Sequence, residues 1–451
     1  MRTEHGSRLR RFISFFILIA SVLSSASSGA GIGAKAAGAP AAWHGGLNAE
    51  YRAPDSLSLE ERLEVFDEVW SEINEKYYDP GFNGTNWGAA RERFRPLVGD
   101  QKSDEDFYRL LKQMVGELRD AHTRFHTPRE RKEREQLQTV SAGLSIFEVE
   151  GQPVITAIDP LSEASRAGIE PGMIVRTING TPVLDILKET QARIGGSSSD
   201  RAVRLRTYRR VIDGEADTPL RLGLKRADGT TLNVEVMRRV VPDGARVTSR
   251  RLPSGYGYIK LNLWKSPIHK EFKNALKQLI DTPGLIVDLR GNPGGEVNEV
   301  LRIAGFFFNL RVPFGKFLTR SGKSLELFTG KDEDKAYAGS VVILINEGSG
   351  SGSEMFSGVM QENGRAIVIG RQSCGCLLGI ARFRKVKGGG ELAISELGYT
   401  SPRGRTLEGA GVMPNGEITL RISDLQRGRD LAVEEAENSL RSSIRSSSEL
   451  R

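Results

Sequence analysis

Residues 341–356 read Val-Val-Ile-Leu-Ile-Asn-Glu-Gly-Ser-Gly-Ser-Gly-Ser-Glu-Met-Phe, and this stretch decides the fold. The five apolar residues Val341–Ile345 predict a strand buried on both faces, because no polar residue alternates with them. A glycine-serine turn follows, and the next residues predict a helix over 353–363. A strand, a tight turn and a helix in this order are the building unit of a layered α/β core.

Similar patterns extend this core in both directions. Short apolar runs predict strands over 256–261, 284–289 and 366–369, and helical spacing predicts a helix over 270–279. We therefore expect a layered α/β core at residues 250–425, within a multidomain chain of mixed α/β class.

Two other regions precede the core. Residues 52–130 predict a helical N-terminal subdomain, with helices over 58–77, 87–97 and 104–118. Residues 140–240 instead contain short strands separated by turn residues, with a polar insertion at 184–218 to which no role is assigned. Several domains are expected, since 451 residues are too many for one compact core.

The N-terminus has the features of an export signal. Three arginines precede the apolar run Phe12–Leu23, and small residues follow it. We expect a signal peptide at 1–29 and a Gly/Ala/Pro-rich linker at 30–51. The apolar run is shorter than the ~20 residues that cross a bilayer, so no stable membrane span is expected after cleavage. The protein is therefore expected to be exported to the periplasm or outside the cell, and membrane-anchored only if the signal stays uncleaved.

The composition narrows the class of partner. Hydrophobic residues make up 38% of the chain and charged residues 27%, as in soluble globular proteins. The net charge of +7 is scattered, without a basic stripe interleaved with aromatic residues, so nucleic acid is not an expected partner. The serine-rich, basic tail at 438–451 is expected to be disordered.

The chain has two cysteines, Cys374 and Cys376. They exclude a disulfide framework as the basis of the fold, and two thiols alone make a poor metal site. We expect no metal and no cofactor. The pair could form a disulfide in an oxidising compartment, or Cys376 could be a small residue that fills a strand, and the sequence leaves both readings open.

A serine in the glycine-serine turn is a candidate nucleophile. Backbone N–H groups at the start of the following helix can stabilise an oxyanion, and the glycines let a substrate approach the chain. Taken alone, the run is equally compatible with phosphate binding or with a plain connection.

Three strings together resemble the C-terminal processing peptidases. They are Asp288-Leu-Arg-Gly-Asn-Pro-Gly-Gly295, the glycine-serine run, and Arg403-Gly-Arg-Thr-Leu-Glu-Gly-Ala-Gly-Val-Met-Pro414, within a resemblance that extends from about Leu59 to Thr419. The resemblance implies an exported serine endopeptidase that cleaves unfolded or C-terminally exposed polypeptides through an acyl-enzyme. It also implies Ser351 as the nucleophile, with an oxyanion hole from the N–H groups of Gly352 and of Gly294 or Gly295.

Residues 162–180 resemble the signature of a PDZ domain. The string Ser-Glu-Ala-Ser-Arg-Ala-Gly-Ile-Glu-Pro-Gly-Met-Ile-Val is followed by Ile-Asn-Gly. In PDZ domains a glycine-containing loop presents N–H groups to the terminal carboxylate of a peptide that joins the sheet edge. The resemblance assigns that role to Ala142, Gly143, Leu144 and Ser145, so the PDZ domain at 140–240 is expected to bind the substrate's C-terminus.

The resemblance fails at the general base. The bacterial branch has a lysine 25 residues after the serine and a glutamine four residues later, where this chain has Cys376 and Ile380. The tricorn-like branch instead uses a histidine oriented by a glutamate, and the matching positions hold His122 and Glu408. We therefore predict Ser351 as nucleophile, His122 as general base and then acid, and Glu408 as the group that orients the imidazole.

Other residues compete for these roles. His126 is a second candidate base, Thr123 is expected to assist by hydrogen bonding, and Lys385 or Lys387 restores a lysine mechanism only if a strand is shifted. A chain without a working base would be a catalytically inactive PDZ scaffold that binds peptides. That reading is the alternative to the peptidase.

Overall fold

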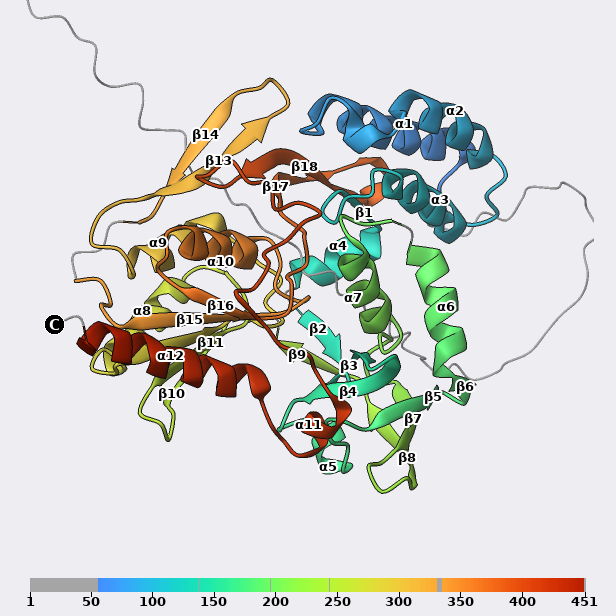
Figure 1. The fold of residues 1–451 in the computed structure, drawn as a ribbon. Helices are drawn as coiled ribbons and strands as arrows, with labels where there is room; N and C mark the ends of the chain where they lie inside the picture. The colour runs from blue at the N-terminus through green and yellow to red at the C-terminus, as the bar shows by residue number, and fades with distance from the viewer. Residues whose placement is uncertain (1–55, 137, 195, 243, 331–334, 450–451) are drawn as a thin grey trace, which may run out of the picture.

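The computed structural model describes residues 56–449 except 137, 195, 243 and 331–334. It contains a helical N-terminal region, a β-rich middle region and a larger α/β core (Figure 1). The predicted mixed α/β class is confirmed. The predicted signal peptide at 1–29 and linker at 30–51 lie outside the described residues.

A six-stranded sheet of order β10-β11-β12-β15-β16-β19 forms the centre of the core. The five strands β11, β12, β15, β16 and β19 of this sheet are parallel to one another, and β10 is antiparallel at one edge. The strands are β10 Val247–Arg251, β11 Gly257–Leu261, β12 Gly284–Asp288, β15 Ser340–Ile345, β16 Ile367–Gly370 and β19 Gly416–Glu417. The apolar runs in the sequence therefore predict the ends of four of these strands, β11, β12, β15 and β16, to within one residue.

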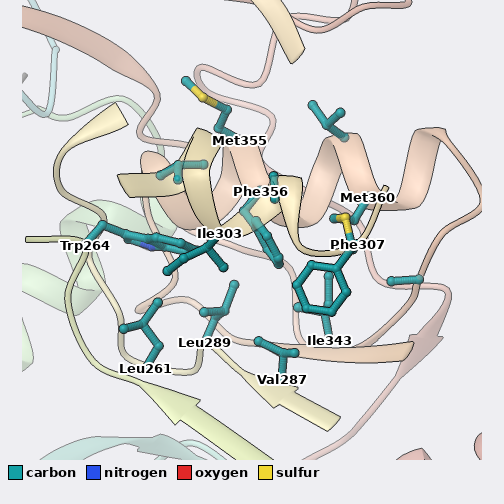
Figure 2. Close-up of a cluster of buried hydrophobic side chains, with 14 of the residues drawn as sticks. Leu261, Trp264, Val287, Leu289, Ile303, Phe307, Ile343, Met355, Phe356 and Met360 are labelled. Atoms are coloured by element: carbon teal, nitrogen blue, oxygen red, sulfur yellow. The ribbon is translucent and has the colours of Figure 1, made fainter. Parts of the chain in front are cut away.

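Helices cover both faces of this sheet (Figure 1). Because successive side chains of a strand point to opposite faces, Ile343 packs with one layer, and Val342 and Leu344 with the other. Figure 2 shows the first layer, where Trp264 and Phe356 lie over the strands. The helices of that layer are α8 Ile268–Gln278, α9 Val297–Gly305 and α10 Gly352–Glu362, and the opposite face is covered by α12 Leu431–Glu449.

Helix α12 corrects one prediction. The composition of residues 438–451 predicts disorder, yet residues up to Glu449 belong to the helix. Ala432, Ala436 and Leu440 are spaced by four residues and are buried against the sheet. Burial of this apolar stripe stabilises the helix. The composition alone predicts disorder because serines outnumber the few apolar residues of the stripe.

The N-terminal helices pack on a second sheet. Ser58 caps α1 reciprocally with Glu61: Ser58 N donates to Glu61 Oε2 at 2.6 Å, and Glu61 N donates to Ser58 Oγ at 3.2 Å. The helices are α1 Leu59–Lys76, α2 Trp87–Phe94 and α3 Asp104–Gly116, and the strands are β1 Arg124–His126, β13 Pro313–Thr319, β14 Ser324–Phe328, β17 Leu378–Lys385 and β18 Glu391–Thr400. Strand β1 pairs with β18, which fixes the end of the helical region against strands from the C-terminal half of the chain.

The middle region is a sheet of order β3-β4-β5-β7-β8, with β3 at its edge. The polar insertion forms two helices, and α7 lies beside β3, with the rings of Phe147 and Tyr208 5.3 Å apart. The strands are β3 Leu144–Val149, β4 Gln152–Ile158, β5 Ile174–Ile178, β6 Thr181–Pro182, β7 Pro219–Lys225 and β8 Thr231–Met237, with β2 Gln138–Ser141 paired to β9 Arg239–Pro242. The helices are α4 Pro128–Glu135, α5 Glu163–Arg166, α6 Val183–Ile194, α7 Asp200–Arg210 and, near the C-terminus, α11 Ile422–Gln426.

Candidate active site

The glycine-serine run forms a tight turn between β15 and α10, with Ser351 at the helix N-terminus. Ser351 has φ +50° and ψ −108°, a backbone conformation that is unfavourable for a residue with a Cβ. Such strain persists only where the surroundings hold it, and it is typical of residues at functional sites. A serine held this way between a strand and a helix presents its hydroxyl as nucleophiles do in strand-to-helix turns.

Hydrogen bonding distinguishes Ser351 from the other two serines of the glycine-serine run. Ser349 Oγ donates to the carbonyl of Leu289 at 2.8 Å. Ser353 Oγ donates to the carbonyl of Asn292 at 3.0 Å and accepts from Trp264 Nε1 at 2.9 Å. Within the described part of the chain, the Ser351 hydroxyl donates no hydrogen bond, and its side chain forms a capping box with Glu354 at the start of α10. It is the hydroxyl of the run that is left for chemistry.

A buried carboxylate, Glu354, holds the turn in place. Its Oε2 accepts from the N–H groups of Ser351 at 2.8 Å and Cys376 at 2.9 Å. Its Oε1 accepts from Ser373 Oγ and from Gly375 N, both at 2.6 Å. Burial raises the pKa of Glu354, and the four hydrogen bonds oppose that rise. Sequence reasoning missed this residue, although its position three residues after Ser351 is the signal of a capping carboxylate.

The Asn-Pro-Gly-Gly turn lies against the nucleophile turn. Gly294 N donates to Asn292 Oδ1 at 2.9 Å, so this N–H is committed within the turn. The N–H groups of Gly295 and Gly352 have no partner among the residues described here. A Cβ placed on Gly352 would lie 3.5 Å from Gly295 N, so these two groups are neighbours. Of the predicted oxyanion-hole residues, Gly352 and Gly295 therefore fit the role better than Gly294.

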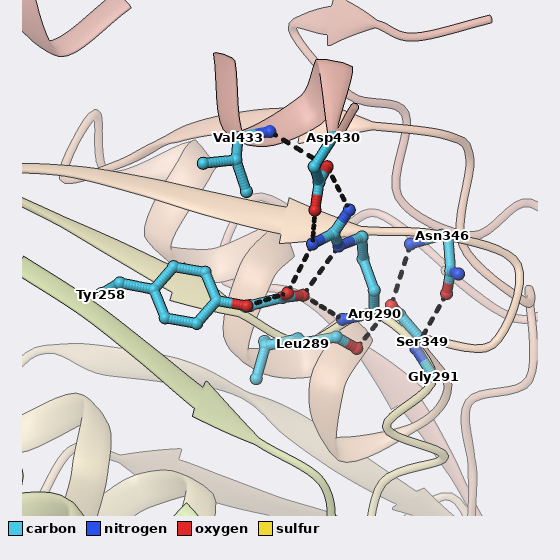
Figure 3. A network of polar contacts seen from close by, with 9 residues as sticks. Tyr258, Leu289, Arg290, Gly291, Asn346, Ser349, Asp430 and Val433 are labelled. Carbon is cyan, nitrogen blue, oxygen red and sulfur yellow. Dashed lines mark hydrogen bonds and ion pairs between the residues drawn. The ribbon is translucent and has the colours of Figure 1, made fainter. Parts of the chain in front are cut away.

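Asp288 and Arg290 anchor this second turn (Figure 3). Arg290 donates to Asp288 through Nε and Nη2, and to both carboxylate oxygens of Asp430 at 2.8 Å, which ties the turn to the start of α12. Tyr258 OH donates to Asp288 Oδ2 at 2.6 Å. Burial alone would raise the pKa of Asp288, but the Arg290 guanidinium lowers it. Both charges are thus engaged in holding the turn.

His122 comes from the segment between α3 and β1 and is buried. Asp120 Oδ1 accepts from the backbone N–H of His122 at 2.6 Å, and Thr123 Oγ1 donates to Asp120 Oδ2 at 2.5 Å. His122 Nδ1 lies 4.0 Å from Asp120 Oδ1 and has no hydrogen-bond partner within the described chain. Burial lowers the pKa of His122 to about 4 against the attraction of Asp120. The imidazole is therefore neutral at pH 7, as a general base must be.

Glu408 lies near the segment that carries His122. Its Oε2 accepts from Leu377 N at 2.6 Å. Burial, together with the charge of Asp120, raises its pKa well above the usual range, and the Ser198 hydroxyl opposes this rise. Ser198 Oγ also accepts from Ala121 N at 2.9 Å, so one serine lies between Glu408 and the segment that carries His122. In the described chain no hydrogen bond joins His122 to Ser351 or to Glu408.

Cys374 and Cys376 form a disulfide, so the pairing that the sequence left open is present. The three competing bases differ in their surroundings. Lys387 Nζ donates to Glu64 of α1 at 2.9 Å, and Lys385 is exposed at the end of β17 farther from the disulfide. His126 is buried where β1 pairs with β18, beside Phe383.

The predicted peptide-binding loop, residues 142–145, enters the edge strand β3. Gly143 has φ +74°, and a Cβ placed there would lie 2.1 Å from Ser162 Cβ, so the loop requires glycine. The carbonyl of Gly143 accepts from Asp159 N at 2.8 Å, and its N–H donates to Ser141 Oγ at 3.0 Å. The loop is thus fixed at the end of an open sheet edge.

The insertion contributes residues that sequence reasoning missed. Arg201 of α7 donates to the carbonyls of Ser373 at 2.8 Å, Gly409 at 3.1 Å and Ala410 at 2.8 Å. One guanidinium therefore joins the residue just before the disulfide to the two residues just after Glu408. No motif marks Arg201, because its partners are backbone carbonyls far away in the sequence.

Two further features concern membranes and metals. None of the described helices combines the length and the apolar surface needed to span a membrane. The described residues also contain no group of three His, Cys, Asp or Glu side chains placed to hold a metal ion.

Two family models match parts of the chain. Residues 255–418 match peptidase family S41, and residues 58–116 match the tricorn protease C1 domain. The first match covers both turns around Ser351 and the segment of Glu408, and the second covers the helices that precede His122.

Similar proteins carry related descriptions. A carboxyl-terminal-processing protease of Synechocystis sp. is 28% identical over 375 residues, which cover 80% of this chain and 82% of that protein. A chloroplastic carboxyl-terminal-processing peptidase of Arabidopsis thaliana is 26% identical, covering 79% and 69%. Among solved structures, a photosystem II D1 C-terminal processing protease has a TM-score of 0.56 at 22% identity, covering 82% of this chain and 98% of that one. Mature CPAF has a TM-score of 0.67 at 14% identity, covering 86% and 98%, so both structures share the fold.

Proposed function

Because this chain is a serine-type peptidase related to the carboxyl-terminal processing proteases, we propose that it is exported and cleaves unfolded or C-terminally exposed polypeptides through an acyl-enzyme on Ser351. One observation carries the proposal. Ser351 lies on a strained turn, and its hydroxyl donates no hydrogen bond to a described residue. Beside it are the N–H groups of Gly295 and Gly352, which have no partner within the described chain. Acyl transfer requires a nucleophile next to oxyanion donors, together with a general base that activates the nucleophile.

The proposed reaction assigns one role to each group. Ser351 Oγ attacks the carbonyl carbon of the scissile bond while His122 takes its proton, and the N–H groups of Gly295 and Gly352 stabilise the oxyanion. His122 then gives the proton to the leaving amine, and the C–N bond breaks. Water, deprotonated by His122, hydrolyses the acyl-enzyme and regenerates the serine.

Two observations support Glu408 as the partner of the imidazole. His122 Nδ1 is buried without a hydrogen-bond partner among the described residues, and the pKa of Glu408 is raised by burial and by neighbouring carboxylates. A bond from Nδ1–H to Glu408 would satisfy the nitrogen and stabilise the imidazolium formed during attack. We propose that substrate binding brings His122 Nδ1 and the Glu408 carboxylate together, since catalytic hydrogen bonds are often long before the substrate binds.

The middle region supports capture of the chain end. An extended peptide can add to the open edge of β3, with its carboxylate at the loop of residues 142–145. Helix α7 lies beside that edge, and Arg201 at its start contacts the segments around Glu408. A peptide bound along β3 therefore lies next to an element that contacts the active site.

Cleavage of casein by the Ser351→Ala variant tests the proposal. We expect a loss of about 10⁴-fold or more, because the acyl-enzyme cannot form. Ser357→Ala is the matched control and should keep its activity, since the Ser357 hydroxyl only donates to a carbonyl within α10. Cleavage by Ser351→Ala at the wild-type rate would remove Ser351 from the mechanism.

A catalytically inactive, peptide-binding scaffold is the second candidate. One observation favours it: the described chain contains no hydrogen bond between Ser351 and His122. This candidate predicts peptide binding without cleavage by the unmodified protein.

A further inference from the structure

We propose that the Cys374–Cys376 disulfide is a redox-sensitive clamp on the active site, which positions Glu354 and Glu408 while it is formed and slows cleavage when it is reduced. The inference rests on the proposed function. It concerns how the Ser351 site is kept in shape, and it starts from the loop of residues 373–377.

This loop is bonded to the nucleophile turn. Gly375 N, Cys376 N and the Ser373 hydroxyl all donate to the Glu354 carboxylate, and the same carboxylate accepts from Ser351 N. A second link runs from Cys374 N to the carbonyl of Ser349 at 3.0 Å. A change in the loop therefore reaches the backbone of Ser351 through one shared carboxylate, that of Glu354.

The loop is also bonded to the segment of Glu408. Leu377 N donates to Glu408 Oε2 at 2.6 Å, and Gly409 N donates to the carbonyl of Gly375 at 2.9 Å. One short segment thus supplies N–H groups to the carboxylate beside the nucleophile and to the carboxylate proposed to orient His122. The relative positions of Ser351 and Glu408 depend on the backbone shape of this segment.

The disulfide closes the centre of that segment. Residues 372–377 belong to no helix or strand, so no regular hydrogen-bond ladder fixes them before β17 begins. The two sulfurs restrict the backbone on either side of Gly375, and Ala121 and Ala202 pack against them. Breaking the S–S bond gives the segment conformational freedom at the place where its N–H groups must converge on Glu354.

Reduction is a balanced exchange with a dithiol. The S–S bond takes up two electrons and two protons to give two thiols, and the dithiol reductant becomes its own disulfide. Cys374 and Cys376 are 7% and 6% exposed, so we expect a slow reaction that favours small dithiols. In an oxidising compartment the bond persists, whereas in a reducing cytosol it is absent. The clamp would therefore keep the peptidase slow until export.

The test compares the oxidised and the dithiothreitol-reduced protein on a cysteine-free fluorogenic peptide. Reduction should lower kcat by about tenfold or more through misplacement of the catalytic groups, while KM stays within about twofold because the peptide-binding loop is elsewhere. Reoxidation should restore kcat. The chain has two cysteines, so titration of two thiols identifies the reduced state without ambiguity.

The double variant Cys374→Ser/Cys376→Ser is the matched control. It should have the low kcat of the reduced protein and be insensitive to dithiothreitol. The rate at which a fluorophosphonate labels Ser351 should fall in parallel, which a loss of fold stability alone would not cause while the protein stays folded at the assay temperature. If the variant fails to fold, the comparison of kcat between the oxidised and the reduced unmodified protein still tests the proposal.

Different outcomes separate this inference from the proposed function. Equal kcat in the oxidised and reduced states, or full activity of the double variant, overturns the clamp and leaves the peptidase intact. A protein that neither cleaves the peptide nor labels at Ser351 in the oxidised state overturns both.

Discussion

At the scale of the residue, hydrogen bonds give a reason for choosing Ser351 that is independent of the resemblance. The run Ser-Gly-Ser-Gly-Ser does not say which serine reacts. Ser349 and Ser353 donate their hydroxyls to the adjacent turn. Ser351 has a φ of +50°, and its hydroxyl donates no hydrogen bond to a described residue. The same comparison favours Gly295 over Gly294 as the second residue of the predicted oxyanion hole, because the N–H of Gly294 donates to Asn292.

The pKa of His122 predicts the acid limb of the pH profile. A general base must be neutral, so activity is present above its pKa in the folded protein and is lost as the pH falls through that value. Burial lowers this pKa from 6.5 to about 4. We therefore expect kcat/KM, measured from pH 4 to pH 8, to fall only well below pH 6.5. A limb centred at or above 6.5 would contradict a buried imidazole as the base.

At the scale of the element, two long-range pairings assemble the site. Strand β1 pairs with β18, which places the segment of His122 against the core, and α7 reaches the loops around the disulfide and Glu408. The strands and helices of the core are predictable because their apolar patterns are local. These contacts are not, because they join residues far apart in the sequence through backbone groups.

The peptide-binding loop gives a prediction for KM. In Gly143→Ala the new Cβ meets Ser162 at 2.1 Å, so the loop must shift. We expect KM for a peptide with a free C-terminus to rise about tenfold with kcat nearly unchanged, the signature of lost uniform binding. Gly151→Ala is the matched control, since Gly151 has φ +71° but open space around it. Equal KM values in the two variants would exclude this loop from substrate binding.

Helix α12 gives a prediction for stability. Leu440 is fully buried against the sheet, so Leu440→Ala should reduce the free energy of unfolding by about 2–5 kcal/mol. Leu184→Ala, at a position that is 63% exposed in α6, is the control and should have little effect. Chemical denaturation of both variants measures the difference. Equal stability would mean that α12 is not docked as described.

At the scale of the whole molecule, all three regions contribute residues to the candidate active site. His122 follows the helical region, Arg201 and Ser198 come from the insertion of the middle region, and Ser351 and Glu408 belong to the core. The class of fold and the candidate triad could be predicted from strand patterns and motifs. The role of the insertion could not, because its polar residues find their partners only in the assembled molecule.

Labelling by a fluorophosphonate, followed by mass spectrometry, tests the central claim most directly. The account predicts a single adduct on Ser351, with labelling about 10³-fold slower in His122→Ala because the general base is gone. His126→Ala is the matched control, a second buried histidine whose loss should leave the rate nearly unchanged. An adduct on another residue, no adduct at all, or equal rates in His122→Ala and the unmodified protein would contradict the account.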